Sequence, residues 1–162
     1  MTRRLLKIMG YYQVIGGAIG IGLCINGFFE LYPSAPLVTF TLLAAVLLYA
    51  YSIYCGSCLL RFTNYRTSLK HSIANQFIQL LVFQTSSLVY KFVSGVAIFV
   101  GVNASPKLLV SIKATHSTFL FHVGDTGGDL FIGVNLVALG LILSFFLALH
   151  QSAPVGPPPA RV

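Results

Sequence analysis

The stretch from His71 to Val102 constrains the fold most, because it is apolar enough to enter a lipid bilayer and long enough to cross one. It also carries polar side chains at helical spacing. At 100° per residue they fall within an arc of about 140°. These residues are Gln76, Gln79, Gln84, Ser87, Tyr90, Lys91 and Ser94. The pattern predicts a membrane helix over residues 72–102 with one polar face, which we call the polar stripe.

Composition places the whole chain among polytopic membrane proteins. Of its 162 residues, 56% are hydrophobic and 8% are charged, and the mean hydropathy is +0.85. A soluble domain is usually about one-quarter charged. Further apolar runs predict helices at about residues 8–29, 37–60 and 130–149. The predicted fold is therefore an all-α membrane protein, a bundle of four transmembrane helices that forms a single domain over residues 1–150.

The segment that follows the polar stripe changes its period. From Leu108 to Ser117 apolar and polar residues alternate, as in a β-strand. Residues 124–129 (GDTGGD) have the composition of a turn. We expect a short extracytoplasmic β-hairpin or ribbon over about residues 107–128, between the third and fourth helices. Residues 151–162 are rich in proline and are predicted to form a disordered cytoplasmic tail.

Most basic residues and all the acidic residues are expected on opposite sides of the membrane. Basic residues precede the first apolar run and fill the connection between the second and third runs: Arg3, Arg4, Lys7, Arg61, Arg66 and Lys70. The acids, Glu30, Asp125 and Asp129, lie in the other connections. The positive-inside rule then places both termini in the cytoplasm, in a plasma or inner membrane. The net charge of +7 reflects this topology, so no nucleic-acid partner is expected.

Lys91 is the most unusual member of the polar stripe, because it falls near mid-depth of the predicted helix. A lysine there costs about 2.5–3.5 kcal/mol on insertion scales and should face protein, water or an acid. Glu30 is the candidate charge partner on a neighbouring helix end. Two interpretations remain open: the stripe joins helices at an interface, or it lines a conduction path whose ring of lysines would favour anions.

The first apolar run is rich in glycine. Gly16, Gly20 and Gly27 recur at helical spacing and form one face of small residues. Such faces allow membrane helices to approach closely. We expect this face to pack against another helix, of the same chain or of a partner.

Motifs of enzymes and metal sites are weak in this chain. Cys55 and Cys58 have the spacing of a redox pair, but the predicted location is the reducing cytoplasm. His116 and His122 could share a metal only with a third ligand. The chain contains 3 acidic residues in total, so acid–base catalysis by carboxylates is nearly excluded. We expect no enzyme activity, no cofactor and no metal.

The sequence thus favours a small non-enzymatic membrane protein. The preferred hypothesis is a structural or accessory subunit that packs through its glycine face and polar stripe into a homo-oligomer or a larger membrane complex, in contact with membrane lipids. The alternative is a small ion channel or transporter that uses the stripe around Lys91. A membrane thiol or quinone redox protein is a more distant alternative, which would need Cys24 close to the Cys55–Cys58 pair.

Overall fold

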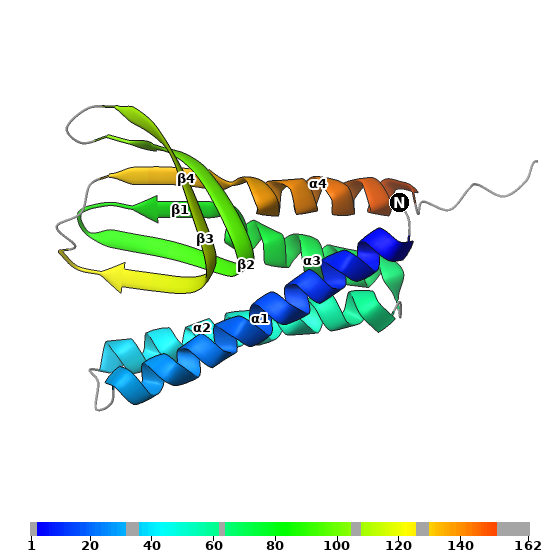
Figure 1. Ribbon diagram of the computed structural model, residues 1–162, viewed down its shortest axis with the longest axis horizontal. Coiled ribbons are helices and arrows are strands. Elements are labelled where there is room, and N and C mark those ends of the chain that lie inside the picture. Colours follow the sequence, from blue (N-terminus) through cyan, green and yellow to red (C-terminus); the bar gives the residue numbers. More distant parts are fainter. Residues whose placement is uncertain (1–2, 32–35, 62–63, 105–107, 126–129, 152–162) are drawn as a thin grey trace, which may run out of the picture.

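The computed structural model describes residues 3–31, 36–61, 64–104, 108–125 and 130–151 (Figure 1). Helices form one end of the molecule and a sheet forms the other, while the first two helices run along both (Figure 1). The elements in chain order are α1 (Arg3–Leu31), α2 (Pro36–Arg61), α3 (Tyr65–Leu80), β1 (Leu81–Gln84), β2 (Leu88–Asn103), β3 (Leu109–Val123), β4 (Phe131–Asn135) and α4 (Leu136–Gln151).

The all-α bundle of four transmembrane helices predicted from the sequence is wrong. The described residues contain a four-stranded antiparallel sheet beside the helices. The predicted helix over residues 72–102 divides into the end of α3, β1 and β2, and the predicted helix over residues 130–149 divides into β4 and α4. Valine, phenylalanine and tyrosine dominate the region after Leu80, and these residues favour strands.

A tight turn separates β1 from β2 and ends the run that had suggested one long helix. The Thr85 hydroxyl accepts hydrogen bonds from the backbone N–H groups of Ser87 and Leu88, at 3.3 and 3.0 Å. The Thr85 N–H donates to the Leu88 carbonyl at 2.8 Å. Threonine and serine favour such turns because their hydroxyl groups replace backbone partners.

Two of the described helices are long and apolar enough to cross a membrane, namely Arg3–Phe29 within α1 and the whole of α2. They form an antiparallel hairpin in close contact. A Cβ atom on Gly56 would lie 2.5 Å from the Gly10 carbonyl oxygen, so the two backbones meet at this point. α4 has 16 residues and is shorter than a typical span of about 20 residues.

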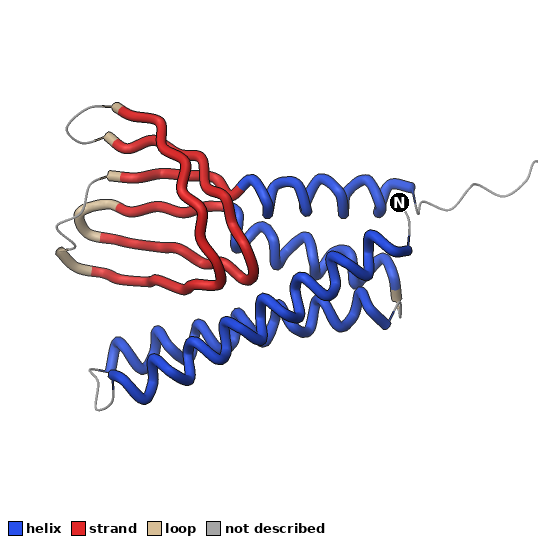
Figure 2. Tube along the Cα trace, in the orientation of Figure 1, coloured by secondary structure: helices blue, strands red, loops and turns tan. Residues whose placement is uncertain are grey.

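Helices α3 and α4 continue directly into strands, as Figure 2 shows. α3 ends at Leu80 and β1 begins at Leu81, while β4 ends at Asn135 and α4 begins at Leu136. The two strands pair with each other, with Leu81 opposite Val134. The centre of the sheet is therefore a direct extension of two packed helices.

The β2–β3 hairpin is bent and wraps around this central pair (Figure 1). The first half of β2 pairs with β1 and the second half with β4, so neither β1 nor β4 is an edge strand. β3 follows β2 along its length and forms both edges. The bend lies at a bulge between Val93 and Val96, where Gly95 has a φ of 104°. Glycine adopts this conformation without the penalty of a side chain.

The bend gives the sheet an inner and an outer face. Apolar side chains from both halves meet on the inner face and form a core cluster: Val82, Val93, Ala97, Phe99 and Phe131. The outer face carries apolar side chains that are largely exposed: Leu81, Val96, Ile98, Val102, Val110, Ile112 and Ile132. A second cluster lies among the four helices and includes Leu6, Leu59, Leu69 and Phe145.

Two sequence expectations about the last third of the chain have separate outcomes. The alternating segment is a strand, β3, but it pairs with β2 and not with a strand of an isolated outer hairpin. Residues 126–129 of the expected turn and residues 152–162 of the expected tail lie outside the described residues.

Candidate functional site

Buried polar side chains from helices and strands form one cluster, which we call the polar core. Each is no more than 1% exposed, although the surrounding helices are apolar. They come from α1, α2, α3, β2 and the end of β4. The members are Gln13, Ser52, Ser72, Asn75, Gln76, Gln79, Ser94 and Asn135.

Ser52 is the central hydroxyl of the polar core. It donates to the Gln13 carbonyl at 3.3 Å and accepts from Asn75 Nδ2 at 3.1 Å. It also accepts from the Ser94 hydroxyl at 2.9 Å. One side chain of α2 therefore joins α1, α3 and β2.

Gln79 connects the same cluster to the sheet and to α4. Its Oε1 accepts from the Ser94 N–H at 2.8 Å, and its backbone carbonyl accepts from Asn135 Nδ2 at 3.3 Å. Asn135 Oδ1 in turn accepts from the N–H groups of Val137 and Ala138, at 3.1 and 3.3 Å. The Asn135 side chain thus caps α4 through its oxygen and hydrogen-bonds to α3 through its nitrogen.

Not every atom of the polar core is satisfied. Within the described part of the chain, three buried amide atoms of this cluster have no hydrogen-bond partner: Gln13 Nε2, Asn75 Oδ1 and Gln76 Nε2. Buried polar groups of this kind usually bind ordered water.

The bend of the β2–β3 hairpin rests on α1. The Ser117 hydroxyl donates to the Gly16 carbonyl at 3.0 Å and accepts from the Gly95 N–H at 2.9 Å. The Tyr12 hydroxyl donates to the Val96 carbonyl at 2.6 Å. A Cβ atom on Gly16 would lie 2.5 Å from the Gly95 nitrogen, so this contact requires glycine.

The other two glycines of the predicted small face have different surroundings. Gly20 packs directly against the ring of Tyr49 on α2. A Cβ atom on Gly27 would make only an ordinary contact with Leu42, at 3.8 Å. Gly16 therefore meets the sheet, whereas Gly20 meets a helix.

Lys91 and Lys113 converge on the inner face of the sheet from opposite halves of the bent hairpin; we call them the lysine pair. Lys91 Nζ lies 3.5 Å from Thr115 Oγ1 and 5.8 Å from the centre of the Phe99 ring. Lys113 Nζ lies 4.1 Å from the centre of the Phe131 ring. Burial lowers the pKa of Lys91 below its usual 10.5, and the charge of Lys113 lowers it further.

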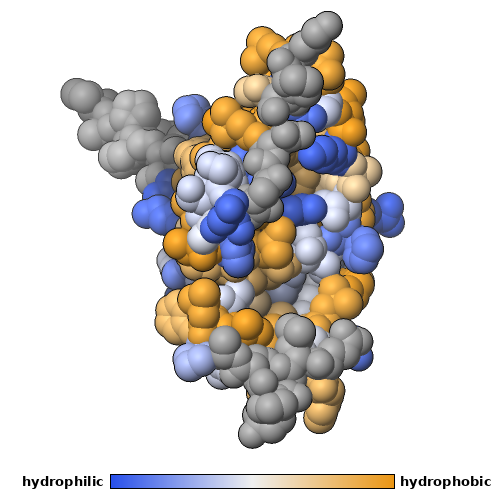
Figure 3. Space-filling model, turned by 90° about the vertical axis from the view of Figure 1, so that its left-hand side faces the viewer, coloured by the Kyte–Doolittle hydropathy of each residue, from blue (hydrophilic) through white to orange (hydrophobic). Residues whose placement is uncertain are grey.

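Figure 3 views the molecule from the end that holds the sheet. Hydrophilic residues gather across the middle of this end, between hydrophobic residues above and below. An open groove of about 370 Å³ lies at the rim of the inner face and is lined by Gln84, Val89, Leu120, His122 and Asp125.

The residues of the predicted polar stripe do not lie on one helix. Gln79 and Ser94 do meet, in the polar core, because α3 and β2 pack together, and Gln76 is buried on the same helix as Gln79. The Tyr90 hydroxyl instead donates to the Ile78 carbonyl at 2.8 Å, and burial raises the pKa of this phenol.

The remaining stripe residues lie around the sheet. Gln84 lines the rim groove, Ser87 lies exposed in the turn before β2, and Lys91 belongs to the lysine pair. The side chain of Glu30, the expected charge partner of Lys91, lies outside the described part of the structure.

The cysteines and histidines singled out in the sequence are dispersed. Cys24, Cys55 and Cys58 are free thiols. Cys24 packs with Tyr49 and Phe92, whereas the Cys55 thiol donates to the His71 carbonyl at 3.4 Å. Among the described residues, no group of at least three potential metal ligands occurs.

No protein-family model, curated protein or solved structure matches the chain. The functional interpretation therefore rests on the chain's own residues and geometry.

Sequence reasoning missed several members of these sites, among them Ser52, Ser72 and Lys113. Ser52 is one of two serines in the apolar helix α2, and no local pattern marks it as the centre of a network. Lys113 did carry a signal, because it is a basic residue on the predicted outer side and opposes the sorting of charges. Lys113 could have been placed near Lys91 only if residues 88–103 had been recognised as a strand, β2.

Proposed function

We propose that the chain is a non-enzymatic integral membrane protein that serves as a structural or accessory subunit. The observation that carries this proposal is the inverted distribution of polarity. The part of α3 from Ser72 to Leu80 buries Ser72, Asn75, Gln76 and Gln79, together with Ile73, and exposes Phe77, whose side chain is 51% accessible. A helix of a water-soluble protein does the opposite. The earlier part of α3 exposes the charged residues Arg66 and Lys70.

The outer surfaces of the other helices support insertion into a bilayer. Large apolar side chains are exposed along α1, α2 and α4, among them Ile8, Ile15, Ile19, Leu37, Phe40, Leu43, Leu47, Leu143 and Leu147. Exposed apolar surface of this extent in water favours association or aggregation. Lipid chains would cover the same surface on α1 and α2 without a penalty.

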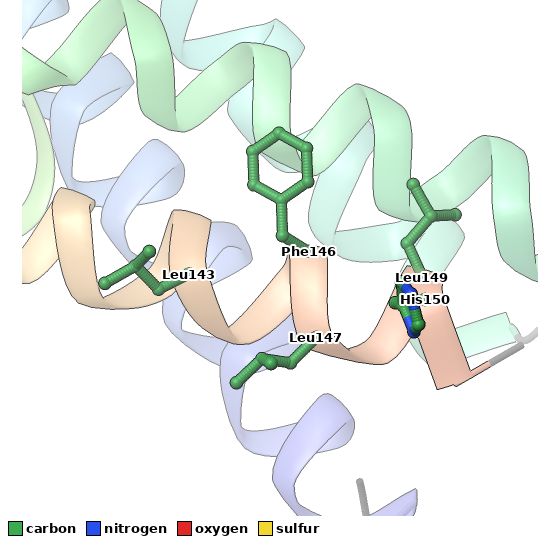
Figure 4. Close-up of a pocket in the computed structure, with 5 residues that line it drawn as sticks. All are labelled: Leu143, Phe146, Leu147, Leu149 and His150. Carbon is green, nitrogen blue, oxygen red and sulfur yellow. The ribbon is translucent and has the colours of Figure 1, made fainter.

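α4 offers a surface for assembly with another subunit. A groove of about 560 Å³ runs beside its second half and is lined by Leu143, Phe146, Leu147, Leu149 and His150. Figure 4 shows these side chains along one length of the helix, with His150 near its end. Such a groove fits the apolar face of a second helix, from another copy or from a partner subunit.

The buried state of the polar core favours a subunit over a channel. Its side chains are no more than 1% exposed and hydrogen-bond to one another. A conduction path requires polar groups that line an aqueous route. The polar core therefore fits a role in holding helices and sheet together.

Extraction and native mass measurement test this proposal. We expect the protein to remain in membranes at alkaline carbonate and to leave them in mild detergent. We expect its native mass in that detergent to exceed that of one chain. Phe146→Ser in the α4 groove should reduce the mass to one chain, whereas Leu43→Ser on α2 should not.

Release by carbonate would contradict the membrane assignment. A native mass of one chain for the wild-type protein, at every detergent concentration tested, would contradict the subunit role.

A further inference from the structure

The bend at Gly95 brings together two lysines that are 22 positions apart. Lys91 lies in β2, opposite Leu120, and Lys113 lies in β3, opposite Phe99. Lys91 Nζ approaches the Phe99 ring at 5.8 Å, so the two side chains flank the same aromatic residue. The fold thus brings two positive charges, one from each strand, to the same face of the sheet.

Such a pairing is unfavourable unless something offsets it. Lys91 is half-buried, and like charges within a partly buried site repel strongly because water screens them poorly. Among the described residues, the two ammonium groups contact the Thr115 hydroxyl and the rings of Phe99 and Phe131. These groups are neutral, and the cation–π contacts offset only part of the repulsion.

The same face supplies a further polar group. Ser111 lies two residues from Lys113 on β3, so both side chains point to the same side of the sheet. Its hydroxyl oxygen is buried and, within the described residues, has no hydrogen-bond partner. Hydroxyl groups of serine and threonine commonly donate to anionic oxygens, as they do in protein contacts with phosphates.

A ligand can reach the inner face from the end of the sheet. Lys113 is exposed, and the open groove at the rim adjoins the strand segment that contains Lys91 and Leu120. His122 and the carboxyl group of Asp125 line the outer part of that groove. An anion would therefore be placed at the lysine pair and not at the rim.

We propose that the inner face of the sheet binds a phosphate group between Lys91 and Lys113, with the hydroxyl group of Ser111 as an additional donor. A phosphodiester carries one negative charge and inorganic phosphate carries up to two near neutral pH, so either would offset the repulsion between the two ammonium groups. Lysine binds phosphate as a compact point charge with several donors. The phosphate group belongs either to a phospholipid headgroup or to a free phosphate. This inference does not rest on the subunit role, because the lysine pair exists within one chain.

Thermal stability of the full chain in mild detergent provides the test. A ligand that binds the folded state raises the melting temperature by mass action. The probes are inorganic phosphate, phosphatidylglycerol micelles and phosphatidylcholine micelles. We expect one of the first two to raise the melting temperature, and phosphatidylcholine, whose phosphate is masked by choline, to have a smaller effect. A response to inorganic phosphate alone indicates a free phosphate; a response to phosphatidylglycerol alone indicates a headgroup.

Variants assign the effect to the lysine pair. In Lys91→Met/Lys113→Met we expect the affinity for the active probe to fall at least about tenfold, as expected for the loss of charged hydrogen bonds. Lys91→Arg/Lys113→Arg retains the charges and should retain binding. Lys70→Met removes an exposed lysine on α3 and should bind like the wild type.

Folding of the double methionine variant is checked by its melting temperature without a probe, which should be at or above that of the wild type, because a repulsion has been removed. The proposal is overturned if neither phosphate probe stabilises the wild type. It is also overturned if the double methionine variant responds as strongly as the wild type.

Discussion

At the scale of single residues, the amides of α3 have unequal roles although they are equally buried. Gln79 accepts the Ser94 N–H at 2.8 Å, whereas Gln76 Nε2 has no partner among the described residues. Both side chains are 1% exposed. Burial alone therefore does not indicate which of the two amides supports the fold.

Replacement of each glutamine by leucine separates these roles. Gln79→Leu leaves the Ser94 N–H buried without its acceptor, and we expect the free energy of unfolding to fall by about 1–3 kcal/mol. Gln76→Leu removes an unpaired amide group and should change it by less than half as much. Denaturation of both variants in mixed micelles, followed by circular dichroism, measures the difference. Equal losses would show that the Ser94 contact contributes little.

The lowered pKa of Lys91 predicts a dependence of stability on pH. The folded state loses the Lys91 proton at a lower pH than the unfolded state, whose pKa is near 10.5. Between these values the unfolded state binds more protons, so the free energy of unfolding rises with pH. Below the folded pKa the charged lysine destabilises the fold.

Comparison of the wild type with Lys91→Met isolates this contribution. The wild type should gain stability relative to the variant as the pH rises from 7 towards 10.5. Burial raises the pKa of Tyr90, which adds a pH dependence of its own, but Tyr90 is present in both proteins. Thermal unfolding at several pH values measures the difference, and a constant difference would show that Lys91 is not destabilised in the fold.

At the scale of elements, the contact between α1 and the bent hairpin depends on backbone proximity. Gly16→Ala would place a methyl group 2.5 Å from the Gly95 nitrogen, so the hairpin or the helix has to shift. We expect a loss of about 1–3 kcal/mol in the free energy of unfolding, as for other overpacked sites.

Gly22→Ala in the same helix is the matched control. A Cβ atom there meets nothing within 4 Å. Alanine is the better helix former, so this variant should be neutral or more stable by up to about 1 kcal/mol. Thermal unfolding of both variants gives the comparison, and similar stabilities would contradict the proposed contact.

The sequence predicted some elements well and others poorly, for physical reasons. α1 and α2 each contain an apolar run long enough to cross a membrane, and a run of that length favours a helix over a strand. β3 alternates because its two faces differ: Val110 and Ile112 lie on the exposed outer face, whereas Ser111 and Lys113 lie on the inner face. β2 does not alternate, since Phe92 and Val93 are both buried, on opposite faces. An apolar run of this kind fits a helix or a strand equally well.

The candidate sites were harder to predict than the elements. Gln76, Gln79 and Ser94 were assigned to one helix, but α3 ends at Leu80 and Ser94 lies in β2. Lys91 could not be paired with Lys113, because their proximity follows from the bend at Gly95. The turn at Thr85, Ser86 and Ser87 was the available signal that the helix does not continue.

At the scale of the whole molecule, the arrangement of helices predicts a topology. The first residues of α1, the end of α2 and the end of α4 lie at the same end of the molecule (Figure 1). If α1 and α2 span the membrane, reporter fusions at the N-terminus and after Gln151 should be active on the same side. A reporter placed in the connection between α1 and α2 should be active on the opposite side.

Opposite signals from the two terminal fusions would contradict this topology. Identical signals from all three positions would show that the hairpin does not cross the bilayer.

The direct junctions at Leu80–Leu81 and Asn135–Leu136 have a consequence for how this chain can vary in length. No loop separates helix from strand, so an inserted residue cannot be accommodated locally. One extra residue would rotate the helix by about 100° relative to the strand. Alternatively, it would exchange the two faces of the strand, so that Val82 would point outward and Leu81 inward. Insertions and deletions at these junctions should therefore be selected against as strongly as changes of the buried residues themselves.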